Sequence, residues 1–198
     1  MKLDIKKLDF EKMNGLLPVI VQDSCDNTVL MLGFMNLEAL EKTIEDKKVT
    51  FFSRTKERLW QKGESSGNFL EVEEILSDCD EDSLLIMAKP VGPTCHTGEK
   101  SCFGAEGDFL RRLFSLIAER KSKMPEGSYT TSLFDAGLDR ILEKIDEESA
   151  EVVVAAKSEG RQRLIEESCD LIYHMYVLLA EEGICLDDLE EELRKRNK

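Results

Sequence analysis

The chain has 198 residues, and 41% of them are hydrophobic, which is enough for one or two packed domains. Its formal net charge of -14 at pH 7 argues against binding to nucleic acid or to an anionic membrane, because phosphate groups would be repelled. The same excess of carboxylates suits divalent cations, which prefer oxygen ligands.

The N-terminal stretch MKLDIKKLDFEKMNG has no apolar core, so we expect no signal peptide. No run of about 18 apolar residues follows it, and no membrane span is predicted. We therefore expect a cytoplasmic protein, in which thiols stay reduced and clustered cysteines act as metal ligands. Cys25, Cys169 and Cys185 stand alone, and we interpret them as small buried apolar residues.

Strand-like segments dominate the first half of the chain. Apolar runs at residues 16–23 and 28–35 are separated by SCDN, which is a turn composition. An amphipathic helix is predicted over residues 36–47, with Asn36 as its N-cap. Further strands are predicted at residues 49–54, 68–76 and 83–89. This half therefore reads as an α+β domain of mostly antiparallel strands with one main helix.

The second half is predicted to be all-α. After the small polar stretch GAEGD, the apolar period changes from about 2 to about 3.6 residues. Helices are predicted at residues 109–123, 138–157, 164–183 and 186–196. We divide the chain into domains at residues 1–105 and 106–198. Each domain is small enough for a homodimer interface to supplement its core.

Three aspartates surround a cysteine in SDCDEDS. Residues two apart face the same side of an extended or turning segment, so Asp78, Asp80 and Asp82 should converge while Cys79 points away. Carboxylates favour Mg²⁺ and thiolates favour Zn²⁺, so one short segment can serve two metals. The alternative is an ordinary acidic turn whose aspartates are solvated.

Cys95 and Cys102 are the natural partners of Cys79, because the residues between them can form a tight loop. Three protein ligands leave an open fourth position, as in a catalytic zinc that carries a water. His96, next to a ligand, is then a candidate proton shuttle. The alternative is a closed structural zinc with His96 as the fourth ligand.

The predicted helical hairpin carries two pairs of acidic residues. Glu148 and Glu151 share one helix face, and so do Glu167 and Asp170. With the hairpin turn at residues 158–160, Glu148 lies level with Asp170 and Glu151 with Glu167. Four carboxylates at one height would repel each other unless Mg²⁺ neutralises them, which creates a phosphate-binding site. The alternative is a solvated charged face.

Other side chains of this half flank the acidic cluster. His174 is interpreted as a packed histidine in preference to a metal ligand. Candidates for phosphate contacts are Arg111, Arg112, Lys144, Arg161 and Arg163.

The two halves resemble two enzyme families of histidine biosynthesis. VIVQDS, VLMLGFMN, FFSR, LWQKGESSGN, DCDED and CHTGEKSCF are similar to phosphoribosyl-AMP cyclohydrolase. PEGSYT, the EExxE of residues 147–151 and the ExxD of residues 167–170 are similar to phosphoribosyl-ATP pyrophosphatase. Together they resemble the fused bifunctional form, which catalyses the second and third steps of the pathway.

The resemblance implies a zinc site of Cys79, Cys95 and Cys102, in which Cys79 crosses a dimer interface. It also implies Mg²⁺ at Asp78, Asp80 and Asp82. The C-terminal carboxylates Glu148, Glu151, Glu167 and Asp170 would hold the Mg²⁺ that engages the triphosphate. Two residues depart from the family pattern: Glu81 stands where glycine is usual, and Asp146 stands where a small residue is common.

The implied chemistry is two successive hydrolyses. The C-terminal half would cleave phosphoribosyl-ATP to phosphoribosyl-AMP and pyrophosphate, with Glu148 and Glu151 as catalytic ligands. The N-terminal half would then open the adenine ring between N1 and C6, with His96 as the proton donor. Candidate substrate contacts are Arg54, Trp60, Lys62, Ser65, Ser66 and Asn68. The competing hypotheses are a zinc-stabilised binding module without activity and a general nucleoside triphosphate pyrophosphatase.

Overall fold

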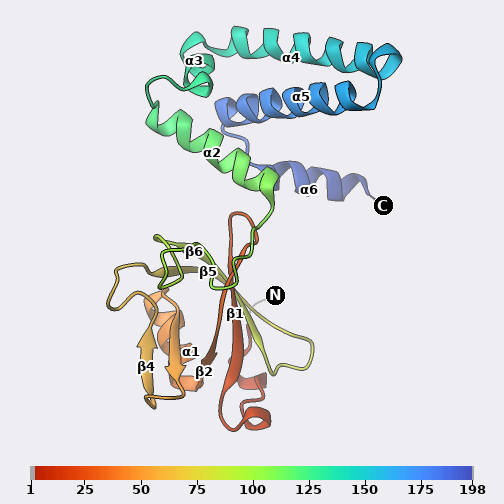
Figure 1. Ribbon diagram of the computed structural model, residues 1–198. Helices are drawn as coiled ribbons and strands as arrows, with labels where there is room; N and C mark the ends of the chain where they lie inside the picture. Colours follow the sequence, from red (N-terminus) through yellow and green to blue (C-terminus); the bar gives the residue numbers. More distant parts are fainter. Residues whose placement is uncertain (1–2, 198) are drawn as a thin grey trace. The chain divides into compact units, whose positions relative to one another are not determined.

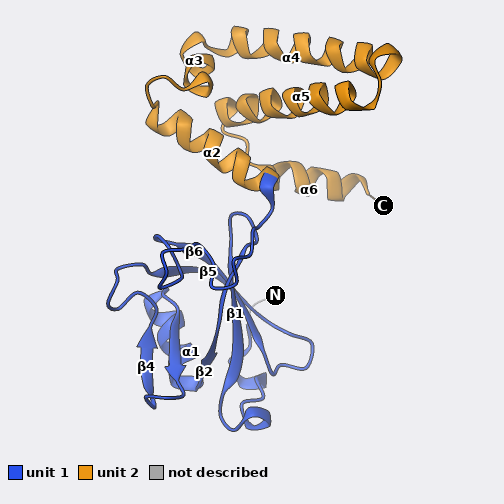
Figure 2. Ribbon diagram, in the orientation of Figure 1, with its two compact units in different colours: residues 1–109 blue, residues 110–198 orange. Residues whose placement is uncertain are grey.

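A computed structural model describes residues 3–197 and divides the chain into two compact units, residues 1–109 and 110–198 (Figures 1 and 2). Met1, Lys2 and Lys198, at the outer limits of the predicted domains, lie outside the described residues. The predicted fold classes are confirmed, with a strand-rich first unit and an all-helical second unit. No helix among the described residues is long and apolar enough to cross a membrane.

The first unit is built on a four-stranded sheet in the order β2-β1-β6-β5. Its strands are β1 (Leu17–Asp23), β2 (Val29–Met35), β5 (Leu70–Ser77) and β6 (Leu84–Pro90). β1 pairs antiparallel with β2 but parallel with β6, so the mostly antiparallel sheet contains one parallel pair. In β1, alternate residues from Leu17 to Asp23 are buried, as expected for a strand with one face on the core.

Helix α1 (Leu37–Asp46) and the hairpin β3 (Thr50–Ser53) and β4 (Arg58–Gln61) complete this unit beside the sheet (Figure 1). As predicted, Asn36 caps α1, because its side chain accepts a hydrogen bond from the Ala39 N–H at 2.9 Å. The buried Thr43 hydroxyl joins α1 to β3, since it donates to Ala39 O and accepts from Thr50 N. Short 3₁₀ turns lie at Ile5–Lys7 and Glu11–Met13.

The second unit consists of α2 (Phe109–Lys123), α3 (Tyr129–Ala136), α4 (Leu138–Val154), α5 (Arg161–Glu182) and α6 (Leu186–Arg196). α4 and α5 run antiparallel, and a π-helical turn (Ala155–Glu159) followed by Gly160 connects them (Figure 1). Gly160 has a φ of +91°, a conformation that other residues rarely adopt, so the chain reverses there. The core of this unit gathers around Ile117, Ile141 and Val177, which are fully buried.

Two elements and three cysteines differ from the sequence-based expectation. Strand β4 and helix α3 were not predicted. The interpretation of Cys25, Cys169 and Cys185 as buried residues is wrong, because all three are exposed. Cys185 instead caps α6, with its thiol 2.9 Å from Asp188 Oδ2. A lone cysteine gives no local signal of its burial, which depends on which helix face meets a neighbour.

Candidate active sites

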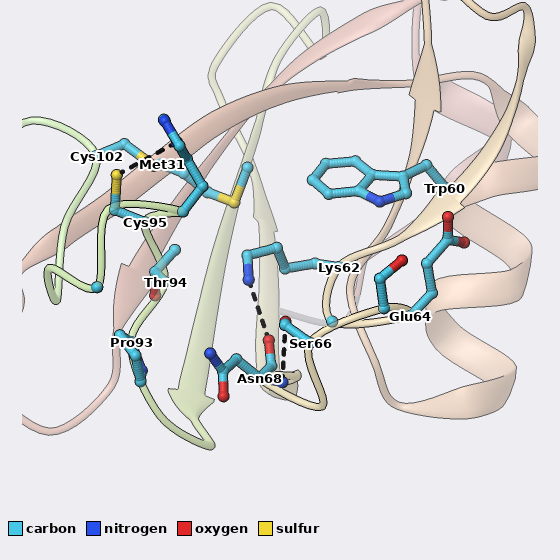
Figure 3. A pocket seen from close by; sticks show the side chains of 14 residues that line it. Met31, Trp60, Lys62, Glu64, Ser66, Asn68, Pro93, Thr94, Cys95 and Cys102 are labelled. Atoms are coloured by element: carbon cyan, nitrogen blue, oxygen red, sulfur yellow. Dashed lines mark hydrogen bonds between the residues drawn. The ribbon is translucent and has the colours of Figure 1, made fainter.

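A cavity of about 350 Å³ lies in the first unit, between the segment that follows β4 and the loop that follows β6. This volume is within the usual range of small-molecule sites. Cys95, His96 and Cys102 line it. Figure 3 shows Cys95 and Cys102 side by side at one end and Trp60 at the other.

Five of the predicted substrate contacts also line this cavity. They are Trp60, Lys62, Ser65, Ser66 and Asn68. The Lys62 ammonium is held 3.1 Å from the Asn68 carbonyl oxygen (Figure 3). Arg54 is not among the lining residues, because its guanidinium stacks on the Phe34 ring with 3.7 Å to the ring centroid. Sequence reasoning missed Thr94, a buried lining residue whose Oγ1 has no hydrogen-bond partner among residues 3–197.

Three consecutive residues fix the cysteine loop to the sheet. The Lys100 ammonium lies 2.7 Å from both Asp23 Oδ2 and Asp26 Oδ2, which are buried at the β1–β2 turn. The next residue, Ser101, donates its hydroxyl hydrogen to Val29 O at 2.6 Å. Cys102 then donates its N–H to Leu30 O at 2.8 Å. The position of the Cys102 thiol is therefore set by strand β2 and not by the loop alone.

The two thiols differ in their electrostatic environment. Hydrogen bonds from the Thr97 side chain, at 3.1 Å, and from its backbone lower the pKa of Cys95. Burial raises the pKa of Cys102, and the nearby Cys95 raises it further. Burial lowers the pKa of Lys62, against the attraction of both sulfurs. Two sulfurs with opposite pKa shifts and a lysine thus share a small space, which is a setting for a soft cation or for proton exchange.

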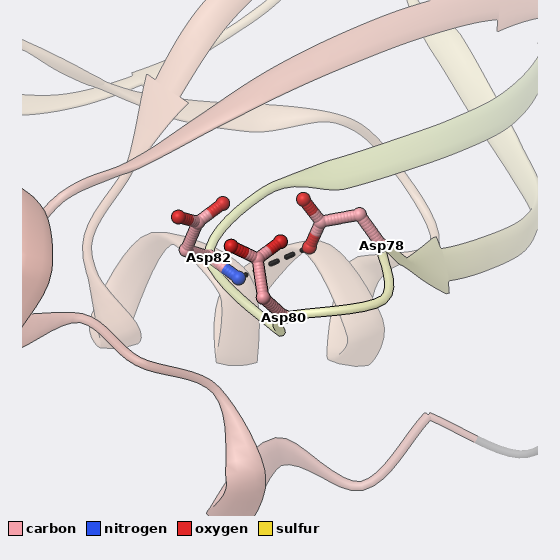
Figure 4. Close-up of side chains that lie close together, drawn as sticks. All are labelled: Asp78, Asp80 and Asp82. Carbon is pink, nitrogen blue, oxygen red and sulfur yellow. Dashed lines mark hydrogen bonds between the residues drawn. The ribbon is translucent and has the colours of Figure 1, made fainter.

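The aspartates of SDCDEDS gather in the tight turn between β5 and β6. One carboxylate oxygen from each of Asp78, Asp80 and Asp82 lies within 4.8 Å of the others (Figure 4). Asp78 accepts hydrogen bonds from the Asp82 and Ser83 N–H groups and from the Ser83 hydroxyl, which lower its pKa to about 2. Cys79 does not point fully away, because its Sγ is 3.9 Å from Asp80 Oδ1.

A lysine that the sequence analysis did not consider fills this acidic turn. The Lys12 ammonium is 2.7 Å from Asp80 Oδ2 and also forms an ion pair with Asp82. Hydrogen bonds to these two carboxylates raise the pKa of Lys12. Glu81, at the tip, has a φ of +60°, the left-handed conformation in which glycine is favoured. The turn is thus strained at Glu81, and a residue far away in the sequence offsets part of its negative charge.

The three predicted zinc ligands do not come together within one chain. Cys79 precedes β6, whereas Cys95 and Cys102 follow it, so the strand places them at opposite ends, about 20 Å apart. Among residues 3–197, the only clusters of three metal-binding side chains are two carboxylate groups. A site that contains all three cysteines would therefore need two chains, as the family resemblance implied, and the zinc site itself stays a prediction.

Carboxylates also meet between α4 and α5 of the second unit. Oxygens of Glu148, Glu151 and Glu167 lie within 4.8 Å of one another, and the predicted pairing of Glu151 with Glu167 across the hairpin is present. Glu148 and Glu167 are buried, at 7% and 1% exposure, which argues against a solvated face. Burial raises the pKa of Glu167, and Glu151 raises it further. Asp170 is exposed and completes no such group.

Two basic side chains form ion pairs with this carboxylate cluster. Arg163 forms ion pairs with Glu167 and, at 3.7 Å, with Glu151. Buried Glu167 Oε1 nevertheless lacks a well-oriented hydrogen bond. Lys144 reaches Glu148 Oε1 at 2.8 Å, and this contact and one to Glu147 raise its pKa.

His174 is buried, as expected for a packed histidine. Its Nδ1 is 2.8 Å from Asp170 O, so it donates there, and its Nε2 accepts from the Tyr129 hydroxyl at 3.1 Å. Arg111, one of the basic residues considered for phosphate contact, pairs instead with Asp187 and Glu190 of α6. No local pattern in the sequence indicates these pairs, since they join separate helices.

Comparison with known proteins identifies the family of each half of the chain. Residues 31–104 match the family model of phosphoribosyl-AMP cyclohydrolase, and residues 110–197 match that of phosphoribosyl-ATP pyrophosphohydrolase. The histidine biosynthesis bifunctional protein HisIE of Bacteroides thetaiotaomicron is 54% identical over 195 residues, which cover 96% of each chain. HisIE of Escherichia coli K12 is 54% identical over 98% of this chain and 97% of its own. The protein of that name from Vibrio cholerae is 46% identical over 97% of this chain and 94% of its own.

The chain belongs to the bifunctional HisIE family. It is a hydrolase of histidine biosynthesis, with a cyclohydrolase domain followed by a pyrophosphohydrolase domain, as the motif resemblance predicted. The thiol-lined cavity lies in the part that matches the cyclohydrolase model, and the carboxylate hairpin lies in the part that matches the pyrophosphohydrolase model. An enzyme, and not a passive binding module, is therefore the correct class.

Proposed function

We propose that the carboxylates of the α4–α5 hairpin and the thiols of the cavity are the metal-dependent centres of the two reactions. Phosphoribosyl-ATP would lose pyrophosphate at the hairpin, and the resulting phosphoribosyl-AMP would have its adenine ring opened at the cavity. The observation that carries the proposal is the burial of Glu148 and Glu167 side by side, since buried like charges are costly unless a cation joins them.

The hairpin fits Mg²⁺ by the chemistry of its donors. Glu148, Glu151 and Glu167 offer three hard oxygens, and Glu167 Oε1, which now forms the ion pair with Arg163, would become a ligand position once Arg163 moves away. We keep Asp170 as a ligand that reaches the metal by a change of side-chain rotamer, because its charge already acts on Glu167. Bound Mg²⁺ would neutralise the triphosphate and orient water for its hydrolysis.

The residues of the hairpin itself have separate tasks in this proposal. The Glu148 and Glu151 carboxylates hold the metal, and Glu151, at 55% exposure, is placed to accept a proton from the attacking water. His174 fixes the wall behind Glu148, because both of its ring nitrogens are hydrogen-bonded. Arg163 would leave the carboxylates as the metal enters, which frees a cation for the phosphates.

The cavity fits zinc at two positions, and we propose that a second copy of the chain supplies the third. Cys95 and Cys102 are adjacent soft donors, and the lowered pKa of Cys95 favours its thiolate. Cys79 lies too far away in its own chain, so its thiol would come from the other subunit of a homodimer. Zinc bound there would supply the Lewis acidity that makes water nucleophilic near neutral pH.

In this proposal the residues that line the cavity contact the adenine ring, and one of them donates a proton. Trp60 offers an aromatic face for the adenine, and Lys62 and Asn68 offer polar contacts. Thr94 also lines the cavity, and its buried hydroxyl has no hydrogen-bond partner among the described residues. His96 lines the cavity with Nδ1 3.8 Å from Cys95 Sγ, and we assign it the proton delivered to the departing N1.

The acidic β5–β6 turn remains our proposed Mg²⁺ site in the first unit. Asp78, Asp80 and Asp82 supply three oxygens within 4.8 Å, and Lys12 already holds a positive charge among them. A divalent cation would have to displace that ammonium. The cytoplasmic location expected from the sequence stays a prediction.

Two variants of the full chain separate the proposed centres. Glu151→Gln should abolish pyrophosphate release from phosphoribosyl-ATP yet keep ring opening of added phosphoribosyl-AMP. Cys102→Ser should lose bound zinc and ring opening together while pyrophosphate release continues. Pyrophosphate, the ring-opened product and zinc content are measured separately. Retained pyrophosphate release in the first variant, or retained zinc and ring opening in the second, contradicts the corresponding assignment.

Substrate profiling tests the alternative for the second unit. A general nucleoside triphosphate pyrophosphatase would hydrolyse ATP, GTP and phosphoribosyl-ATP at similar rates. We expect a strong preference for phosphoribosyl-ATP, in keeping with the family match.

A further inference from the structure

A second cavity adjoins the thiol-lined one. It has a volume of about 280 Å³ and lies over the β3–β4 hairpin. Trp60, Glu64 and Ser65 line both cavities, so the two spaces meet along these side chains. Ser53, Lys56 and Arg58 line only the second one. Figure 3 shows Glu64 beside Trp60, at the end of the first cavity that is far from the cysteines.

Of the two basic side chains that line the second cavity, one is paired with a carboxylate of the same cavity and the other is not. Arg58 is bound to Glu64 through two hydrogen bonds of 2.6 and 3.3 Å and also donates to Leu59 O, so each charge neutralises the other. Those contacts lower the pKa of Glu64, which keeps it ionised. No carboxylate among residues 3–197 forms an ion pair with the Lys56 ammonium. The cavity therefore has a net positive charge from Lys56, with the hydroxyls of Ser53 and Ser65 beside it.

The substrate proposed for the first cavity is a long molecule with two phosphate monoesters, each of which carries a charge of about -1.5 to -2 at pH 7. Phosphoribosyl-AMP carries a ribose 5′-phosphate on each side of its adenine ring. When the first cavity holds the ring, at least one of the phosphates must therefore lie outside that cavity. A lysine and two serine hydroxyls are phosphate ligands, and their electrostatic attraction is strongest where a neighbouring wall excludes water. The lining residues that the two cavities share connect the ring position, past Trp60, with the second cavity.

We propose that this second cavity is a phosphate subsite, in which Lys56, Ser53 and Ser65 bind one of the two ribose 5′-phosphates. The inference rests on the proposed cyclohydrolase site. It adds two residues that were not among the predicted substrate contacts: Lys56, which lies outside the quoted motifs, and Ser53, which belongs to FFSR. In this arrangement the Arg58–Glu64 ion pair forms one wall of the subsite. Trp60, which lines both cavities, lies between the adenine ring and the bound phosphate.

The test combines a residue change with a substrate change in the zinc- and magnesium-loaded full chain. Lys56→Gln should raise KM for phosphoribosyl-AMP about tenfold, with kcat nearly unchanged, since a charge-assisted hydrogen bond that forms in the ground state is lost. The effect should shrink at high salt, as screening weakens the contact. Lys7→Gln, at an exposed lysine of the first 3₁₀ turn, is the matched control and should leave both constants unchanged.

Two truncated substrates identify the phosphate. Each lacks one of the two 5′-phosphates, and both are assayed with the wild-type chain and with Lys56→Gln. For the substrate that lacks the phosphate bound here, the two proteins should have equal KM values, whereas the other should keep the tenfold difference. An unchanged KM for the complete substrate, or a tenfold difference that persists with both truncated forms, overturns the subsite. Absence of ring opening by the wild-type chain would instead contradict the proposed function, and the subsite with it.

Discussion

Replacing Lys100 with methionine would remove the cation that holds two buried aspartates together at the β1–β2 turn. Asp23 and Asp26 are 3% and 1% exposed, and each has an oxygen 2.7 Å from the Lys100 ammonium. Methionine keeps most of the side-chain volume, so the main change is electrostatic. Because Ser101 and Cys102 follow directly, the change also loosens the loop that carries a proposed zinc ligand.

The expected cost lies between two limits. An exposed ion pair contributes up to about 1 kcal/mol, and removal of one partner of a fully buried pair costs about 3–5 kcal/mol. The aspartates are buried, but the Lys100 side chain is 43% exposed, so we expect about 2 kcal/mol. For a unit of this size, that loss lowers the melting temperature by roughly 10 °C.

The pH dependence has a definite sign. Burial raises the pKa of Asp26, but Lys100 and Thr28 outweigh it, so the folded-state pKa is below its usual value. Such a group stabilises the fold above its unfolded pKa of about 3.9, and the contribution is lost as the pH falls through the folded-state value. The stability difference between the wild type and Lys100→Met should therefore be full at neutral pH and shrink in acid, as Asp26 becomes protonated.

Urea unfolding followed by tryptophan fluorescence measures this directly. Trp60 is the only tryptophan of the chain and stacks on Phe51 in the first unit, so its signal reports that unit alone. Lys42→Met is the matched control, because Lys42 pairs with the single surface carboxylate of Asp46. If Lys100→Met lost no more stability than Lys42→Met at pH 7, or lost the same amount at about pH 3, the electrostatic reasoning would be refuted.

Three further changes test other features. Arg163→Gln removes the cation that competes with a metal ion for Glu167. Mn²⁺ binding measured by calorimetry should therefore tighten about fivefold, or roughly 1 kcal/mol. Unchanged affinity would contradict the proposal that the metal displaces Arg163. Glu81→Gly relieves a φ of +60° and should stabilise the first unit by about 0.5–1 kcal/mol in the same urea assay, and a lower midpoint would count against strain there. Gly33→Ala would place a Cβ 2.3 Å from the Phe51 ring, so we expect a loss of about 1–3 kcal/mol, and wild-type stability would show that the ring moves freely.

The sequence predicted most regular elements because their local patterns were strong. Alternating burial in β1 and the Asn36 cap follow from residues that are neighbours in the chain. Strand β4 was missed because it has only four residues and two of them are polar. Helix α3 was missed because Tyr129, Thr130 and Thr131 have low helix propensity, which its Ser128 cap and buried contacts overcome.

The sequence also predicted which residues of each candidate site lie together, where those residues are linked by a short loop or a hairpin. Two residues that are close in the sequence can be placed by spacing, as Cys95 and Cys102 are. Register across a hairpin also follows from counting, which is why Glu151 and Glu167 face each other. The predicted strand at residues 83–89 already separates Cys79 from the other cysteines within one chain, but spacing does not show which residues of a second chain would lie near it.

The amino acids alone specify the available ligand atoms, which are thiols in one half and carboxylates in both, and the motifs that identify the family. The tertiary structure decided which of them meet and what surrounds them. Lys12, Lys100 and Arg163 acquire their roles only there, the first two through partners more than sixty residues away and the third through the packing of α5 on α4. The physical reason is that donor chemistry belongs to each side chain, whereas the distances and burial that set charge interactions arise only when the chain is packed.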